Sequence, residues 1–309
     1  MLVFLDDERC ADVALAGGKG ASLARMTALG LPVPPGFVVP AGALEAALAD
    51  TVAAIREVLA RGERGEDLAA VAREAQALVR SADSGGMFPR EVGDAYARLG
   101  ARSGDVPVAV RSSATAEDSQ AASFAGQQET YLHVRGVADI VERIRDCWCS
   151  FFAERALFYR REKGSLSDLG MAVVVQRMIE PDVSGVLFTV DPTKGRRDRM
   201  VVEAVFGLGE GVVSGQLTPD HYVLARDGRV KRTRLHEQPF AIVHDPAGGV
   251  RAEELPPERG RAQTLHEDQL ARLARVGVDL EARLGGPQDI EWALRDGELY
   301  VLQSRPVTA

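Results

Sequence analysis

The stretch DIEWALRDGELYVLQSRP, residues 289–306, has the pattern of a β-hairpin. Two apolar-rich segments flank residues 295–297, Arg-Asp-Gly, which form a typical turn sequence. Glu291, Gln303 and Arg305 interrupt the apolar segments, and such polar groups are costly to bury without partners. We therefore expect these three side chains to lie on a surface that has a function.

The length of the turn decides whether the three side chains share one face of the hairpin. A two-residue turn over residues 296–297 would turn Glu291 and Gln303 to opposite faces. A three-residue turn over residues 295–297, with its glycine in a left-handed bulge, would put Glu291, Gln303 and Arg305 on one face. The three-residue turn also gives the hairpin one apolar face, and it is the turn we predict.

Carboxylate and amide oxygens on one face suggest a magnesium site. Mg²⁺ prefers oxygen ligands, and its protein sites usually supply a few of them beside substrate phosphates and water. Glu291 and Gln303 are therefore the candidate metal ligands. The alternative is an amphipathic edge hairpin in which Glu291 and Arg305 form a surface ion pair.

Two further stretches have features of phosphate-binding segments. GGKGASL, residues 17–23, predicts glycine N–H groups and Lys19 at the start of a helix, although it is not a Walker A motif. PVAVRSS, residues 107–113, predicts a strand that ends at Arg111, and the small-residue loop SFAGQ follows at 123–127. Each has a plainer alternative, namely a solvated lysine in a surface loop and an arginine in a structural ion pair.

The order of the predicted elements indicates an α+β fold. Strands mix with helices without the regular alternation of a doubly wound sheet. MAVVVQRMI, residues 171–179, predicts an apolar strand whose amide, Gln176, either lines an adenine pocket or belongs to ordinary core. We expect two lobes, an N-terminal one over residues 1–172 and a C-terminal one over residues 173–309.

Composition and charge narrow the class of protein. The 309 residues carry a net charge of −8 without a long basic run, which argues against a nucleic-acid partner. Three cysteines without a CxxC or Cys/His cluster argue against structural zinc and a disulfide framework. We find no signal peptide and no apolar run long enough to span a membrane. We therefore expect a cytoplasmic protein with no membrane partner.

Motifs along nearly the whole chain, from about residue 15 to residue 308, occur in the order found in one family. They are GGKGASL, LPVPPGFVV, VRSSATAED, SFAGQQETYL, VVVQRMI, SGVLFTVDP, GLGEGVVSG and ELYVLQSRPVT. In this order they resemble the ATP-binding domain of phosphoenolpyruvate synthase, pyruvate phosphate dikinase and rifampicin phosphotransferase. The resemblance implies an ATP-grasp-type fold, in which two lobes clamp the nucleotide.

The resemblance also implies a role for each candidate residue, with ATP and Mg²⁺ as the cofactors. Lys19 and Arg111 would bind phosphate, and together with Arg305, which would stabilise the transferred phosphoryl group, they are the catalytic candidates. Gly126 and Thr130 would contact phosphate or nucleotide, and Gln176 would contact the adenine. Glu291 and Gln303 would bind the metal.

Enzymes of this family split ATP to AMP and phosphate through a phosphorylated histidine on a separate swivelling domain. The sequence ends after QSRPVTA without a TGG-x-x-SHA-like segment, so we expect that histidine on another domain or a partner chain. The implied activity is an ATP-dependent phosphotransferase of the dikinase type. Two alternatives stay open: an ATP-grasp carboxylate ligase that forms an acyl phosphate and ADP, and a non-catalytic nucleotide-binding module.

Overall fold

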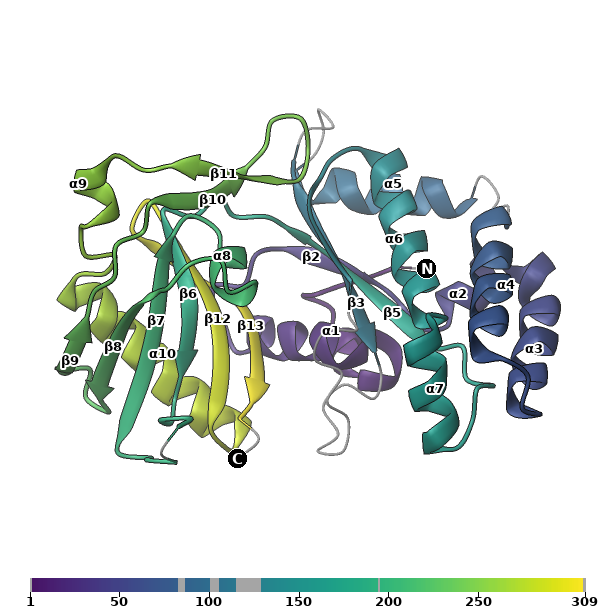
Figure 1. The fold of residues 1–309 in the computed structure, drawn as a ribbon, viewed down its shortest axis with the longest axis horizontal. Helices are drawn as coiled ribbons and strands as arrows, with labels where there is room; N and C mark the ends of the chain where they lie inside the picture. Colours follow the sequence, from purple (N-terminus) through teal and green to yellow (C-terminus); the bar gives the residue numbers. More distant parts are fainter. Residues whose placement is uncertain (1, 83–86, 101–105, 115–128, 194, 308–309) are drawn as a thin grey trace. The chain divides into compact units, whose positions relative to one another are not determined.

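The structure is a computed structural model that describes residues 2–82, 87–100, 106–114, 129–193 and 195–307 (Figure 1). The chain divides into two compact units. The first unit comprises Met1–Ala28 and Pro35–Met178, and the second comprises Leu29–Pro34 and Ile179–Ala309. Both units combine helices with antiparallel sheet, so the predicted α+β class is confirmed.

Among the described residues, the first unit contains a five-stranded antiparallel sheet in the order β1-β2-β5-β3-β4. Its strands are β1 (Val3–Phe4), β2 (Gly36–Val39), β3 (Val108–Ala114), β4 (Thr130–Val134) and β5 (Met171–Arg177). The strand β5 lies in the middle, and its apolar sequence MAVVVQR suits this position because both faces of the strand are covered.

The division between the units lies further along the chain than the boundary expected at residues 172 and 173. The strand β5 hydrogen-bonds to β2 on one side and to β3 on the other, so it belongs wholly to the first unit. Gln176 is therefore a residue of the first unit.

Helices cover both faces of the first sheet (Figure 1). They are η1 (Glu8–Ala11), α1 (Val13–Ala28), α2 (Ala43–Ala47), α3 (Ala49–Glu63), α4 (Leu68–Ser81), α5 (Met87–Arg98), α6 (Val137–Phe151) and α7 (Glu154–Lys163). Val173 and Val175 point into the hydrophobic core under α3 to α7. Val38 and Val174 point the other way, toward Gly20 of α1. We call this second side the α1 face of the sheet.

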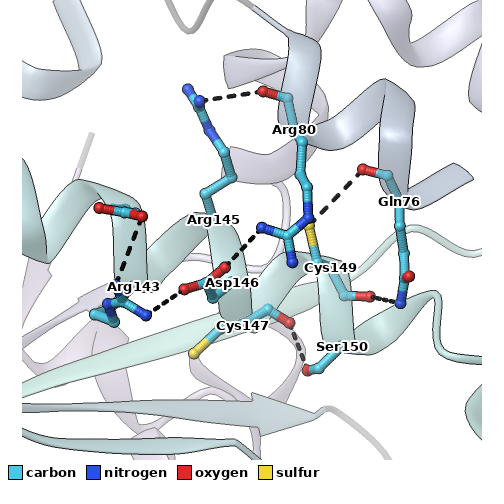
Figure 2. A network of polar contacts seen from close by, with 9 residues as sticks. Gln76, Arg80, Arg143, Arg145, Asp146, Cys147, Cys149 and Ser150 are labelled. Carbon is cyan, nitrogen blue, oxygen red and sulfur yellow. Dashed lines mark hydrogen bonds and ion pairs between the residues drawn. The ribbon is translucent and has the colours of Figure 1, made fainter.

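Polar contacts fix α4 on α6, which packs on β3 (Figure 2). Asp146 of α6 accepts hydrogen bonds from Arg80 of α4 at 3.1 Å and from Arg143 at 2.7 Å. Gln76 of α4 donates to the Cys149 carbonyl at 3.1 Å. Because the Asp146 side chain is only 13% exposed, these contacts hold one charged group at a fixed place beside the core.

Among the described residues, the second unit contains a six-stranded antiparallel sheet in the order β13-β12-β6-β7-β8-β9. Its strands are β6 (Val183–Phe188), β7 (Arg199–Phe206), β8 (Asp220–Ala225), β9 (Val230–Arg234), β12 (Gln288–Arg295) and β13 (Glu298–Pro306). The unit also contains α8 (Glu210–Val213), α9 (Pro257–Gly260), α10 (Glu267–Leu284) and the hairpin of β10 (Phe240–His244) and β11 (Val250–Glu254).

The helix α10 covers one face of this six-stranded sheet. Gly277 of α10 lies so close to the sheet that a Cβ atom there would stand 2.9 Å from Leu187 of β6. Leu187 pairs with Ile290 of β12, which identifies the face beneath the helix. None of the helices in the described part of the chain has the length and apolar character needed to cross a membrane.

Candidate functional site

The turn of the β12–β13 hairpin has two residues, so the predicted three-residue turn is wrong. Arg295 pairs with Glu298, which leaves Asp296 and Gly297 as the turn. Their φ angles are 51° and 78°, as in a type I′ turn. Asp296 tolerates this left-handed conformation better than most residues, and its N–H donates to Asp182 at 2.8 Å.

A bulge in β13 nevertheless brings Glu291 and Gln303 onto one face. The register shifts between Glu291 and Trp292, so that Trp292 pairs with Val301 and Glu291 pairs with Gln303. Leu302 is the extra residue of the bulge. Because Glu291 and Gln303 are direct cross-strand partners, the shared face expected from the sequence arises through the bulge and not through the turn.

Arg305 lies on the same face, where Asp289 holds it. The two residues are cross-strand partners, and the Arg305 Nε and Nη2 atoms each lie 2.8 Å from Asp289 Oδ2. Asp289 is 8% exposed, whereas the Arg305 side chain is 58% exposed. Burial raises the pKa of Asp289 above its ordinary value, although Arg305 opposes this shift. Sequence analysis missed Asp289, but its place two residues before Glu291 could have indicated that the two share a face.

Two more polar residues continue the row that starts at Gln303 and Glu291. Cross-strand pairing runs from Glu291 to Val186, from Val186 to Glu203, and from Glu203 to His221. All of these residues therefore face away from α10. We call this side the polar face. Glu203 is a third carboxylate on the polar face, after Glu291 and Asp289. Sequence analysis missed it because the surrounding segment 200–206 is otherwise apolar and predicts a core strand.

The first unit carries Lys19 on a kinked start of α1. Gly17 has φ 68° and ψ 175°, which breaks the helix before Lys19. A Cβ atom at Gly17 would stand 2.2 Å from the carbonyl oxygen of Ser113, so only glycine lets β3 come this close. The Lys19 ammonium donates to the Ser112 carbonyl at 3.0 Å. The lysine is therefore held beside the residue that follows Arg111 in β3.

Arg111, Thr130 and Gln176 share the α1 face of the first sheet. Arg111 pairs with Thr130 of β4 and with Val174 of β5, which contacts α1. Gln176 lies two residues beyond Val174, so its side chain points to the same side. Thr130 is exposed, Arg111 is half-buried and Gln176 is 4% exposed. This arrangement puts two cations and two hydrogen-bonding side chains around one part of the sheet.

The predicted site residues thus form one group in each unit. The first unit brings together Lys19, Arg111, Thr130 and Gln176, and the second brings together Glu291, Gln303 and Arg305. Gly126 lies outside the described residues. The first group presents cationic donors suited to phosphate, and the second presents two oxygen ligands with a guanidinium beside them.

Comparisons with known proteins identify the family of the chain. The chain is 41% identical to a probable phosphoenolpyruvate synthase of Archaeoglobus fulgidus, with 99% of this chain and 41% of the relative covered. It is 37% identical to a rifampicin phosphotransferase of Bacillus subtilis, with 96% of this chain and 34% of the relative covered. The chain therefore spans less than half the length of these relatives. A family model described as "Pyruvate phosphate dikinase, AMP/ATP-binding domain" matches residues 13–309, so the chain belongs to this family.

Proposed function

We propose that the chain binds Mg²⁺-ATP and phosphorylates a histidine on another domain or chain, as an ATP-dependent phosphotransferase of the dikinase type. One ATP, one water and one histidine would give AMP, phosphate and phosphohistidine. The observation that carries this proposal is the direct pairing of Glu291 with Gln303, with Arg305 on the same face. Membership of an AMP/ATP-binding domain family supports it.

The residues on the polar face fit Mg²⁺. Glu291 supplies a carboxylate and Gln303 an amide oxygen, which are ligands of the kind that Mg²⁺ takes beside substrate phosphates. Arg305 is paired with Asp289, so its positive charge is partly balanced before any anion binds. When bound, Mg²⁺ neutralises charge on the phosphate oxygens.

Each remaining candidate has a role in holding the nucleotide or stabilising charge. Lys19 and Arg111 bind phosphate oxygens, and Thr130, the cross-strand neighbour of Arg111, adds a hydroxyl donor. Gln176 binds the adenine. Arg305 stabilises the negative charge of the phosphoryl group during transfer. In this proposal the fold is of the ATP-grasp type, and the two units are the lobes that clamp the nucleotide.

The nucleotide product tests this function. We expect the full chain, incubated with Mg²⁺-ATP and a purified histidine-bearing partner domain, to release AMP and to label the partner with acid-labile phosphate from β-labelled ATP. Lys19→Met should lower the rate of AMP release by about 100-fold or more, as expected for loss of a cation from a phosphoryl-transfer site. Lys231, an exposed lysine of β9, offers the matched control, and Lys231→Met should keep the wild-type rate.

Two outcomes would contradict the proposal. ADP as the sole nucleotide product would exclude the dikinase type of transfer. Hydroxamate formation from a carboxylic acid, hydroxylamine and ATP without any partner would identify a carboxylate ligase instead.

A further inference from the structure

A hydroxyl group from β3 is inserted into the first helix. In an unbroken α-helix the Gly20 N–H would bond directly to the Ala16 carbonyl. In this helix the Gly20 N–H donates to Ser113 Oγ at 3.2 Å, and Ser113 Oγ donates to the Ala16 carbonyl at 2.8 Å, so the hydroxyl bridges these two groups. Ser113 is 0% exposed, so water does not compete for either bond. A side chain inserted in this way is a known cause of a helix kink.

The serine hydroxyl and the break at Gly17 complement each other. The left-handed φ of Gly17 starts a new helical segment, and the first N–H groups of a helix have no partner within it. Ser113 Oγ accepts one of these, from Gly20, and therefore acts as an N-cap supplied by a distant strand. At Gly17 any Cβ atom would collide with Ser113 O and Oγ, at 2.2 and 2.3 Å. The close approach of the strand therefore requires glycine at position 17, and the Ser113 hydroxyl supplies the cap.

Lys19 lies inside the segment that this contact fixes. It stands between Gly17, where the helix breaks, and Gly20, whose N–H the serine holds. Its ammonium reaches the carbonyl of Ser112, the direct neighbour of Ser113 in β3. A shift of the Gly17–Gly20 turn relative to β3 would therefore move the ammonium away from the Ser112 carbonyl.

We propose that Ser113 is a positioning residue for Lys19: its hydroxyl fixes the Gly17–Gly20 turn on β3 and so places the ammonium at the Ser112 carbonyl. The inference rests on the proposed function in one respect, since it takes the Lys19 ammonium to be a phosphate ligand. A buried serine with a purely structural role would affect stability and leave the phosphate affinity per folded molecule unchanged.

A double-mutant cycle tests whether Ser113 acts through Lys19. We expect Ser113→Ala to weaken Mg²⁺-ATP binding about tenfold in calorimetry, which corresponds to a lost buried hydrogen bond, and to leave adenosine binding within twofold. In a Lys19→Met background, Ser113→Ala should change ATP affinity less than twofold. Ser113→Thr, which keeps the hydroxyl, should recover most of the ATP affinity. Thr27 of α1 donates to the Leu23 carbonyl at 2.9 Å in the ordinary helical manner, so Thr27→Ala is the matched control.

Chemical labelling of Lys19 tests the same inference without any nucleotide. We expect trace acetylation of Lys19 to be several-fold faster in Ser113→Ala than in wild type, with exposed Lys231 as the internal reference. An unchanged labelling rate, or an equal loss of ATP affinity with and without Lys19, would overturn the inference. If Ser113→Ala does not fold, the labelling rate and ATP affinity of Ser113→Thr are compared with those of Ser113→Val. These two side chains are branched and similar in size, and only threonine keeps the hydroxyl.

Failure of the proposed function and failure of the positioning inference can be told apart. If Lys19→Met binds ATP as tightly as wild type, the proposed phosphate role of Lys19 fails. In that case the labelling rates still show whether Ser113 positions the lysine.

Discussion

Single residues decide how the glycine-rich start of α1 meets β3. Gly17 has a left-handed backbone and almost touches Ser113, so two independent requirements fall on one position. The motif GGKG predicted that its glycines and its lysine lie at the start of a helix. It could not indicate which glycine takes the left-handed conformation, because the reason is a strand nearly 100 residues away.

We expect Gly17→Ala to lower the free energy of unfolding by about 3 kcal/mol or more, because left-handed strain and a collision with the Ser113 backbone add together. Gly30 provides the matched control, since its φ is +75° and no atom lies within 4 Å of a Cβ there. Gly30→Ala should cost only about 1 to 2 kcal/mol. Urea unfolding measures both, and equal losses would show that the close approach of β3 has no energetic weight.

The Asp289 carboxyl combines burial with a charged partner. Its folded pKa is raised, so the folded protein binds this proton more tightly than the unfolded chain does. Its contribution to stability is therefore present below the unfolded pKa and is lost as the pH rises through the folded pKa. Burial disfavours the ionised form of this carboxyl, while its contact with Arg305 favours that form.

We expect Asp289→Asn to be at least as stable as wild type at pH 7, and we expect its advantage to shrink as the pH falls below the pKa of Asp289. The same substitution should weaken Mg²⁺-ATP binding about tenfold, because Arg305 loses its charged partner. Urea unfolding across pH and calorimetry measure the two effects. Asp279→Asn, at an ion pair on α10 with the Asp279 side chain 43% exposed, is the control and should change neither by much. A stability advantage of Asn that grows in acid would contradict the account.

Strand pairing determines the site at the scale of elements. The alternation of side chains along residues 289–306 correctly grouped Glu291, Gln303 and Arg305 on one face. The turn length was predicted wrongly because two different devices give the same grouping. A three-residue turn adds its extra residue at the end of the hairpin, whereas this chain adds Leu302 as a bulge inside β13. A bulge of this kind has no clear sequence pattern here, so the sequence does not indicate it.

We expect deletion of Leu302 to keep Mg²⁺-ATP affinity within about threefold, because the regular register that results still pairs Glu291 with Gln303. The control inserts one alanine between Ser304 and Arg305, which turns Arg305 to the opposite face and separates it from Asp289. That insertion should weaken binding about tenfold or more. Equal affinities for the two variants would show that the facing of these residues does not matter.

At the scale of the whole molecule, the chain distributes its candidate residues over two units. Sequence analysis gave the mixed class and two parts, but it placed the division inside β5, at residues 172 and 173. Apolar patterning identifies β5 as a buried strand without showing which sheet it joins, and the pairing with β2 and β3 is long-range information. The family model matches residues 13–309 as one domain. This agrees with the sequence analysis, in which the motifs were specific as an ordered set and weak one by one.

The Mg²⁺ dependence of ATP binding tests the central claim most directly. We expect calorimetry to show that Mg²⁺ strengthens ATP binding to the wild-type chain by about tenfold or more. The double variant Glu291→Ala/Gln303→Ala should lose this dependence. Glu298→Ala, on the same hairpin with a 69% exposed side chain, should keep it. A double variant that retains the full wild-type Mg²⁺ dependence would contradict the assignment of the polar face as the metal site.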